Sequence, residues 1–204
     1  MKRFLILAAT LAFATPVMAA DPVKVSPAEV DTAVKAMFKK LPEGWSPSRI
    51  EQDETQRTCS ETRNAPSTAD GEKIAARELA TIVYPADGKV LGDWKKGEKV
   101  AQSGVGGQFS DGPETVPGGN CYACHQMAPQ ELSYGTIGPS LKGYGKDRKF
   151  EAEAGKVAYG KIFNAQSVLP CSQMPRFGYH KFLSMEQIAD VTAYLMSPDS
   201  PVNK

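Results

Sequence analysis

The sequence predicts an all-α fold in which a helical domain follows a mainly helical N-terminal extension. Apolar residues recur at intervals of three and four in several segments, and residues that commonly cap helices precede these segments. Gly- and Pro-rich stretches separate the segments and predict loops. We find no convincing alternation of apolar and polar residues of the kind that is typical of strands.

Composition limits the classes of protein to which the chain can belong. It has 204 residues, of which 41% are hydrophobic and 23% are charged, and these values are typical of a folded, globular chain. The formal net charge is only +1. Nucleic-acid-binding domains usually carry a strong basic excess, so the charge argues against a nucleic-acid partner.

The first 20 residues have the pattern of a secretory signal peptide. Lys2 and Arg3 precede an apolar core that is too short to span a bilayer, and small residues precede a cut after Ala19 or Ala20. No later apolar run is long enough to span a membrane. We therefore expect a periplasmic protein without a membrane span, exported through a cleaved signal.

Residues 21–92 form the expected extension. One helix is predicted over 27–41, with Ser26 as its N-cap, and a second over about 71–84. The stretch between them, over 45–70, is polar and rich in turn residues and is predicted to be loop.

Residues 93–204 form the expected main domain. Asp93 is the predicted cap of its first helix, and a further helix is expected over about 147–162. The clearest pattern is that of the last helix, which begins after Ser184 with a capping box and ends before Pro198.

The stretch "GGNCYACHQM" carries the most specific motif in the chain. Cys121 and Cys124 lie on the same side of one turn, where both sulfurs can bond to the two vinyl groups of one porphyrin. His125 then lies over the porphyrin face, where its imidazole can bind the iron. The Cys-x-x-Cys-His pattern predicts one covalently attached haem c.

Three other interpretations of the motif compete with haem attachment. A zinc site needs two more ligands, and the available side chains, Cys59, Cys171 and His180, lack the paired spacing of structural zinc sites. A thioredoxin-like redox pair needs a βαβ context that the sequence does not predict. A local disulfide beside an incidental histidine is the third. Haem attachment is favoured because it uses both the spacing and the adjacent histidine.

A haem iron bound by His125 has a second axial position. The candidate ligands are His180, Met127, Met174, Met185, Met196 and Cys171. Met174 is favoured because it lies in a loop that Pro175 stiffens, and His180 stays open as an alternative. A thioether opposite a histidine raises the reduction potential, which suits an electron carrier rather than a catalytic haem with a vacant face.

Four segments, in this order, resemble the class I cytochrome c family. They are "GEKVAQSG" (97–104), "CYACH" (121–125), "GPSLKGYG" (138–145), and "MPRFG" with "IADVTAYL" (174–178 and 188–195). The resemblance implies a class I cytochrome c fold over the main domain.

The resemblance also implies roles for individual residues. The Pro139 carbonyl should accept a hydrogen bond from the second ring nitrogen of His125, and this agrees with the usual orientation of ligating histidines. Gly97 and Tyr194 should lie where the first and last helices of the domain cross, with glycine allowing close approach.

The phrases "GNCYACH", "GTIGPSLKGYG" and "MPRFG…LSMEQIADVTAYL" more narrowly resemble the SoxX family. SoxX proteins are small subunits that pair with the larger cytochrome SoxA in a thiosulfate-oxidising complex, the L-cysteine S-thiosulfotransferase. The resemblance implies a heterodimer and no catalytic residue on this chain. It also implies transfer of electrons from the SoxA haem to a soluble cytochrome c. A freestanding periplasmic carrier is the alternative, and a haem peroxidase is less favoured.

Two cysteines remain once the haem pair is set aside. Export and the even number favour a disulfide between Cys59 in the extension and Cys171 in the ligand loop. Closing so long a loop stabilises a protein by about 4 to 5 kcal/mol in the chain-entropy model. The alternatives are a reactive Cys171 near the haem and two inert thiols.

Overall fold

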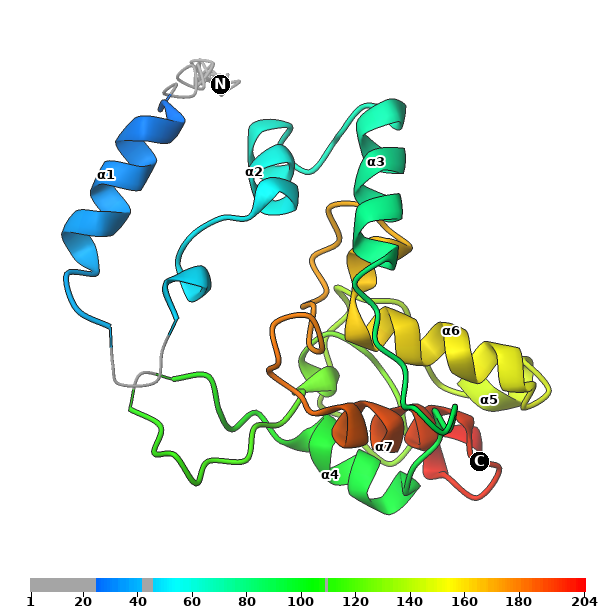
Figure 1. Ribbon diagram of the computed structural model, residues 1–204. Helices are drawn as coiled ribbons and strands as arrows, with labels where there is room; N and C mark the ends of the chain where they lie inside the picture. The colour runs from blue at the N-terminus through cyan, green and yellow to red at the C-terminus, as the bar shows by residue number, and fades with distance from the viewer. Residues whose placement is uncertain (1–24, 42–45, 109) are drawn as a thin grey trace, which may run out of the picture. The chain divides into compact units, whose positions relative to one another are not determined.

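The computed structural model describes residues 25–41, 46–108 and 110–204 (Figure 1). The predicted signal peptide of residues 1–20 lies outside the described residues. The chain divides into two compact units, Met1–Glu43 and Gly44–Lys204, and each is described by itself. Within the described ranges, no helix has both the length and the apolar character needed to cross a membrane.

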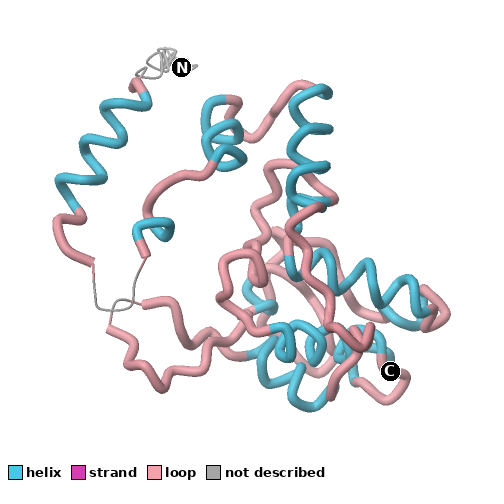
Figure 2. Tube along the Cα trace, viewed as in Figure 1, coloured by secondary structure: helices cyan, strands magenta, loops and turns pink. Residues whose placement is uncertain are grey.

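The described residues are helical or irregular, and none forms a strand (Figure 2). This confirms the predicted all-α fold class. The first unit contains α1 (Pro27–Met37). The second contains the helices α2 (Glu54–Glu61), α3 (Thr68–Leu79), α4 (Trp94–Gln102), α5 (Tyr144–Asp147), α6 (Ala152–Phe163) and α7 (Met185–Met196). It also contains the short 3-10 turns η1 (Pro47–Arg49), η2 (Cys121–Ala123), η3 (Ala165–Ser167) and η4 (Pro201–Asn203).

Helix α1 begins as predicted and ends earlier. The Ser26 hydroxyl accepts from the Glu29 N–H, and the Glu29 carboxylate accepts from the Ser26 N–H at 2.7 Å, which completes a capping box. The helix ends at Met37 rather than at residue 41, and none of its residues is buried.

Helices α4 and α7 cross at very short range in the second unit. A Cβ atom added to Gly97 would lie 2.0 Å from the carbonyl oxygen of Asp190, so only glycine fits there. The Asp190 carboxylate accepts from the Asp93 N–H at 2.7 Å, which fixes the start of α4 on α7. Tyr194, one turn further along α7, is fully buried. The crossing therefore lies where the sequence places it.

The helix predicted over about 147–162 is α6, which begins later, at Ala152, because a break separates it from α5, which ends at Asp147. The residues between them include Lys149 and Phe150, whose φ angles are 52° and 55°. This left-handed backbone ends one helix and turns the chain into the next. Helix α6 then buries one face, including the fully buried Tyr159, against the core that α7 shares.

The segment predicted as loop over 45–70 contains a helix, α2. Asp53 caps it, because its carboxylate accepts from the Gln56 N–H at 2.8 Å and its own N–H donates to the Gln56 side chain at 3.0 Å. The segment has few apolar residues, so periodicity could not show a helix. The N-cap residue Asp53 was therefore the sequence feature that could have indicated this helix. Helix α3 likewise starts before residue 71, because Ser67 caps it.

The predicted disulfide is present. Cys59 on α2 is bonded to Cys171, which is 112 residues further along the chain, and their Cα atoms are 5.3 Å apart. Both cysteines are buried, and they pack with Ile74 of α3. Residues that the sequence analysis assigns to the extension are thus covalently bonded to the main domain.

A buried ion pair links the same two parts of the chain. Arg176 and Glu78 each expose 3% of their side chains, and the guanidinium donates to the Glu78 carboxylate at 3.1 Å. A second donation reaches Asp53 at 2.5 Å. Burial alone would raise the pKa of Glu78. Hydrogen bonds from Asn164 and from its other partners outweigh that effect, so its pKa lies below the ordinary 4.5 and the carboxylate is ionised.

Replacement of Gly97 by alanine tests the helix crossing. The added methyl group would overlap the α7 backbone, so we expect Gly97→Ala to lower the free energy of unfolding by about 3 kcal/mol in denaturant titrations. Gly155→Ala is the control within a helix. The nearest atom to its Cβ would be 3.5 Å away, so this variant should be neutral or stabilised by about 1 kcal/mol. Equal effects in the two variants would contradict the crossing geometry.

Candidate haem site

The attachment motif forms a single tight turn, η2. Asn120 takes a left-handed backbone with φ 47°, and the Cys124 and His125 N–H groups both donate to the Cys121 carbonyl, at 3.1 and 2.9 Å. The turn brings both motif cysteines and His125 together. Cys121 and Cys124 are partly buried free thiols and are not bonded to each other. Burial raises the pKa of the Cys121 thiol to about 12.

A carbonyl of the following loop orients the His125 ring. Nδ1 of His125 lies 2.7 Å from the Pro139 oxygen, which is the contact that the family resemblance implies. Because a carbonyl only accepts, Nδ1 carries the proton and Nε2 keeps its lone pair. The Gly138 N–H donates to the Cys124 carbonyl at 2.9 Å, which holds this loop against the attachment turn. Nε2 is therefore the ring atom that remains able to bind a metal.

Two glycines allow this loop to lie directly on the turn. A Cβ atom on Gly135 would lie 1.9 Å from the Ala123 carbonyl oxygen. A Cβ atom on Gly138 would lie 2.2 Å from Cε1 of His125. The loop backbone thus supports the turn and one side of the histidine ring.

A buried tyrosine pair joins the turn to α7. The hydroxyl oxygens of Tyr122 and Tyr194 are 2.8 Å apart, and the Tyr122 hydroxyl also accepts from the Ala128 N–H at 3.1 Å. Burial and the Tyr122 hydrogen bond both raise the pKa of Tyr194, so its hydroxyl is neutral. The family resemblance implies a place for Tyr194 at the helix crossing but gives no sign of this hydrogen-bonded pair.

The candidate axial ligands differ in their surroundings. Met127 and Met196 lie in the core, with 1% and 3% exposure, and the Cys171 sulfur is in the disulfide. Met185 is 46% exposed at the start of α7. Met174 is partly buried and packs against the core cluster, as the partly buried Cys121 also does.

His180, the alternative axial ligand, packs edge-on against the Tyr179 ring at 5.0 Å. Burial lowers the pKa of His180, and the nearby Arg176 lowers it further.

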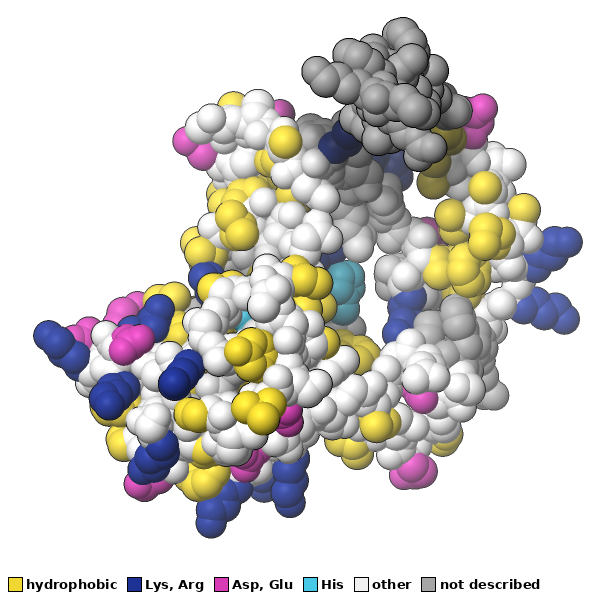
Figure 3. Space-filling view, turned by 180° about the vertical axis from the view of Figure 1, so that it is seen from behind, with side chains coloured by type: hydrophobic (Ala, Val, Ile, Leu, Met, Phe, Trp, Pro, Cys, Tyr) yellow, Lys and Arg dark blue, Asp and Glu magenta, His cyan; other side chains and the backbone are white. Residues whose placement is uncertain are grey.

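Charged side chains of both signs are interspersed over the face shown in Figure 3. Lys142, Lys146, Arg148 and Lys149 are all exposed around α5. Arg148 stacks on the Tyr144 ring at 3.7 Å. Among the described residues, no group of three or more His, Cys, Asp or Glu side chains could hold a metal ion.

A helical fold with an oriented Cys-x-x-Cys-His turn defines a haem-binding domain of the c type, and the match to a protein family agrees. Residues 109–198 match the cytochrome c family. An uncharacterized lipoprotein of Aquifex aeolicus (strain VF5) is 40% identical over 188 residues, which cover 89% of this chain and 86% of that protein. The crystal structure of SoxXA from P. pantotrophus is 26% identical with a TM-score of 0.41, over 57% of this chain and 89% of that chain.

The chain belongs to the same family as the Aquifex protein and contains a cytochrome c domain. Members of the cytochrome c family carry covalently bound haem c, so the domain that contains residues 109–198 is a haem-binding electron-transfer domain. The residues present fit this cofactor. Both thiols of the turn are unbridged, and the hydrogen bond to Pro139 leaves Nε2 of His125 available.

Replacement of Gly138 by alanine tests the support of His125. The added methyl group would overlap the imidazole, so we expect Gly138→Ala to tilt the ring and to increase the high-spin fraction of the ferric haem, measured by electron paramagnetic resonance. The free energy of unfolding should fall by about 2 to 3 kcal/mol. Gly112→Ala is the control, because no atom lies within 4 Å of its Cβ position. A wild-type spectrum in Gly138→Ala would contradict the proposed support.

Proposed function

We propose that this chain is a monohaem cytochrome in which Cys121 and Cys124 hold the haem, while His125 and Met174 bind its iron. The observation that carries the proposal is the geometry of the attachment turn. It leaves two thiols free while Pro139 fixes the proton on Nδ1 of His125. Each thioether would form when an S–H bond adds across a vinyl C=C bond, so no group leaves and no oxidant is consumed.

When bound, the haem supplies a one-electron Fe(III)/Fe(II) couple. The role of the chain's own residues is to hold both axial positions. His125 keeps its orientation through Pro139, and Met174 would occupy the opposite face. Such a site has no vacant position for substrate and needs no proton transfer at these side chains. A thioether ligand raises the reduction potential, so the arrangement suits electron transfer rather than peroxide chemistry.

We further propose that the chain is the small electron-transfer subunit of a SoxAX-type complex. The support is the resemblance of the attachment, Pro139 and Met174 segments to SoxX proteins. Joining the thiosulfate dianion to the thiol of a carrier-protein cysteine forms one S–S bond, breaks the S–H bond, and releases two electrons and one proton. In this proposal the catalytic haem belongs to SoxA, and the present chain passes the electrons one at a time to a soluble cytochrome c.

The proposed location is the periplasm. The pattern of the first 20 residues supports export. The disulfide between Cys59 and Cys171 supports an oxidising compartment, because such bonds rarely persist in the cytosol.

Substitutions at the proposed ligands test the haem assignment. Cys121→Ala/Cys124→Ala should abolish the haem stain on a denaturing gel. Met174→Ala should bind cyanide at its ferric haem at least about tenfold faster than wild type, because its face is always open. The exposed Met185 provides the control, and Met185→Ala should keep the wild-type rate. If wild type already binds cyanide as fast as Met174→Ala, the site is open, Met174 is not the ligand and a peroxidase is favoured.

Purification from thiosulfate-grown source cells tests the subunit assignment. A tagged copy of the full chain should co-purify with a second, larger haem-stained protein in equal amount. Cells that express the untagged chain are the control for non-specific recovery. Recovery of a monomeric chain with a single haem band would overturn the subunit role and support a freestanding carrier, while leaving the haem assignment intact.

A further inference from the structure

We infer that α2 and α3 form a clamp that positions Met174 on the haem iron. The clamp consists of the Cys59–Cys171 disulfide and the pairing of Arg176 with Glu78 and Asp53. This inference rests on the proposed ligation by Met174. It assigns a function to residues of the predicted extension, which the cytochrome c motifs do not explain.

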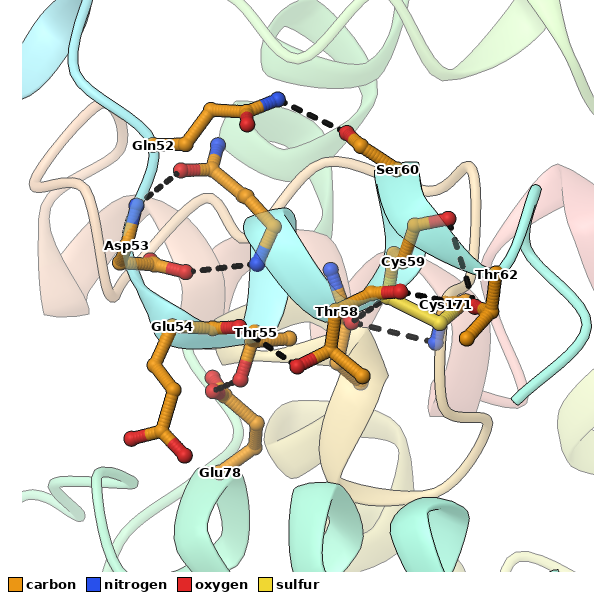
Figure 4. Close-up of a disulfide and its surroundings, with 12 residues drawn as sticks. Gln52, Asp53, Glu54, Thr55, Thr58, Cys59, Ser60, Thr62, Glu78 and Cys171 are labelled. Atoms are coloured by element: carbon orange, nitrogen blue, oxygen red, sulfur yellow. Dashed lines mark hydrogen bonds between the residues drawn. A yellow bond between two sulfur atoms is a disulfide. The ribbon is translucent and has the colours of Figure 1, made fainter. Parts of the chain in front are cut away.

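The disulfide anchors the chain three residues before Met174. Cys171 has a left-handed backbone with φ 59°, and its N–H donates to the Gln166 side chain at 3.1 Å. Its sulfur is bonded to Cys59 of α2 (Figure 4). The N-terminal end of the ligand segment is thus fixed by a covalent bond to α2 and by a hydrogen bond to η3.

Arg176 anchors the chain two residues after Met174. Its side chain is 3% exposed, donates to Glu78 of α3 and to Asp53 at the N-cap of α2, and stacks on Tyr179 at 4.3 Å. Buried charge is retained only where it is paired and hydrogen-bonded. The guanidinium therefore cannot move toward solvent without leaving the buried Glu78 carboxylate with only the longer ion pair to Arg77, at 3.7 Å.

The Glu78 carboxylate accepts hydrogen bonds from three side chains, those of Arg176, Asn164 and Thr55. Asn164 donates to its carboxylate at 2.7 Å, and Thr55 of α2 donates to the other carboxylate oxygen (Figure 4). Arg77 donates to the Thr55 hydroxyl at 2.6 Å. The acceptor for Arg176 is therefore part of a network that includes both α2 and α3.

These two anchors leave Met174 at the centre of a short segment with both ends fixed. The Met174 N–H donates to the Ser172 hydroxyl at 3.2 Å, and Pro175 restricts the next φ angle. An external ligand can reach the iron only while Met174 is away from it. Its binding rate is therefore proportional to the fraction of molecules in which this segment is displaced. Release of either anchor should raise that fraction.

The test uses the full-length holoprotein and measures imidazole binding to the ferric haem by stopped flow. Glu78→Gln removes the buried one of the two carboxylates that pair with Arg176, leaving Asp53, and should raise the binding rate at least about tenfold. Cys59→Ala/Cys171→Ala removes the other anchor without leaving a thiol, and should also raise it. Arg176→Lys keeps the charge but loses the two-pronged donation, so its rate should lie between those of wild type and Glu78→Gln.

Two control variants separate positioning from general stability. Glu186→Gln removes an exposed ion pair, 3.0 Å to Lys96, away from the clamp and should keep the wild-type rate. Val202→Ala removes methyl groups from a fully buried position in η4 and lowers stability without touching the clamp. The charge-transfer band of methionine-ligated ferric haem should weaken in the clamp variants and persist in both controls.

The outcomes distinguish the clamp from the ligand assignment. The clamp would be overturned if Glu78→Gln and the double cysteine variant bound imidazole at the wild-type rate while Met174→Ala bound it faster. Met174 would then remain the proposed ligand. An equal rate rise in Val202→Ala would also overturn it, because destabilisation alone would then explain the effect. If Met174→Ala keeps the wild-type rate and band, the ligand assignment fails and the clamp fails with it. If Glu78→Gln does not fold, the double cysteine variant decides.

Discussion

The close approach of α4 to α7 at Gly97 is the constraint on which the haem site depends. With no side chain between them, the α4 backbone lies on the Asp190 carbonyl of α7. Backbone hydrogen bonds then join the C-terminal end of α4 to the residues just before the attachment motif. The Gly119 N–H donates to the Val100 carbonyl and the Asn120 N–H to the Ser103 carbonyl, both at 2.8 Å. The position of the attachment turn is therefore set by where the two helices cross. The Tyr122–Tyr194 pair adds a direct contact between the turn and α7. The helix crossing, the two backbone hydrogen bonds and the tyrosine pair together fix His125, the proposed iron ligand, relative to the core.

The Met174 side of the proposed site is held by interactions of another kind. The ligand segment around Met174 has no helix of its own, and its anchors are a disulfide and a buried charge network. Burying Arg176 and Glu78 costs hydration energy that the ion pair offsets only while all of its partners are in place. Such a network contributes little net stability but strongly disfavours displaced arrangements. That property suits a segment whose task is to hold one sulfur atom in place.

Much of the fold follows from local sequence patterns. Caps at Ser26, Asp93 and Ser184 and the Cys-x-x-Cys-His turn depend on neighbours along the chain, and the structure shows the same caps and turn. The break between α5 and α6 was missed because left-handed φ angles at Lys149 and Phe150 have no signature in those residue types. The partners of Arg176 were missed for another reason. They lie about a hundred residues away in sequence, at positions 53 and 78, and only the folded chain brings them together.

The four cysteines show which part of cysteine pairing the sequence predicts and which part the fold determines. The number and spacing of the cysteines predict that two thiols bind the haem and that the other two form a disulfide. They do not determine which thiols meet during folding. Geometry separates the pairs. Cys59 and Cys171 are brought to a Cα distance of 5.3 Å by α2 packing on the ligand loop, whereas Cys121 is held by the attachment turn. Burial also raises the pKa of Cys121 to about 12, and because the thiolate is the species that attacks disulfides, this thiol is a poor partner for exchange at neutral pH. The disulfide therefore forms where α2 packs on the ligand loop, while burial in the attachment turn keeps the Cys121 thiol out of disulfide exchange.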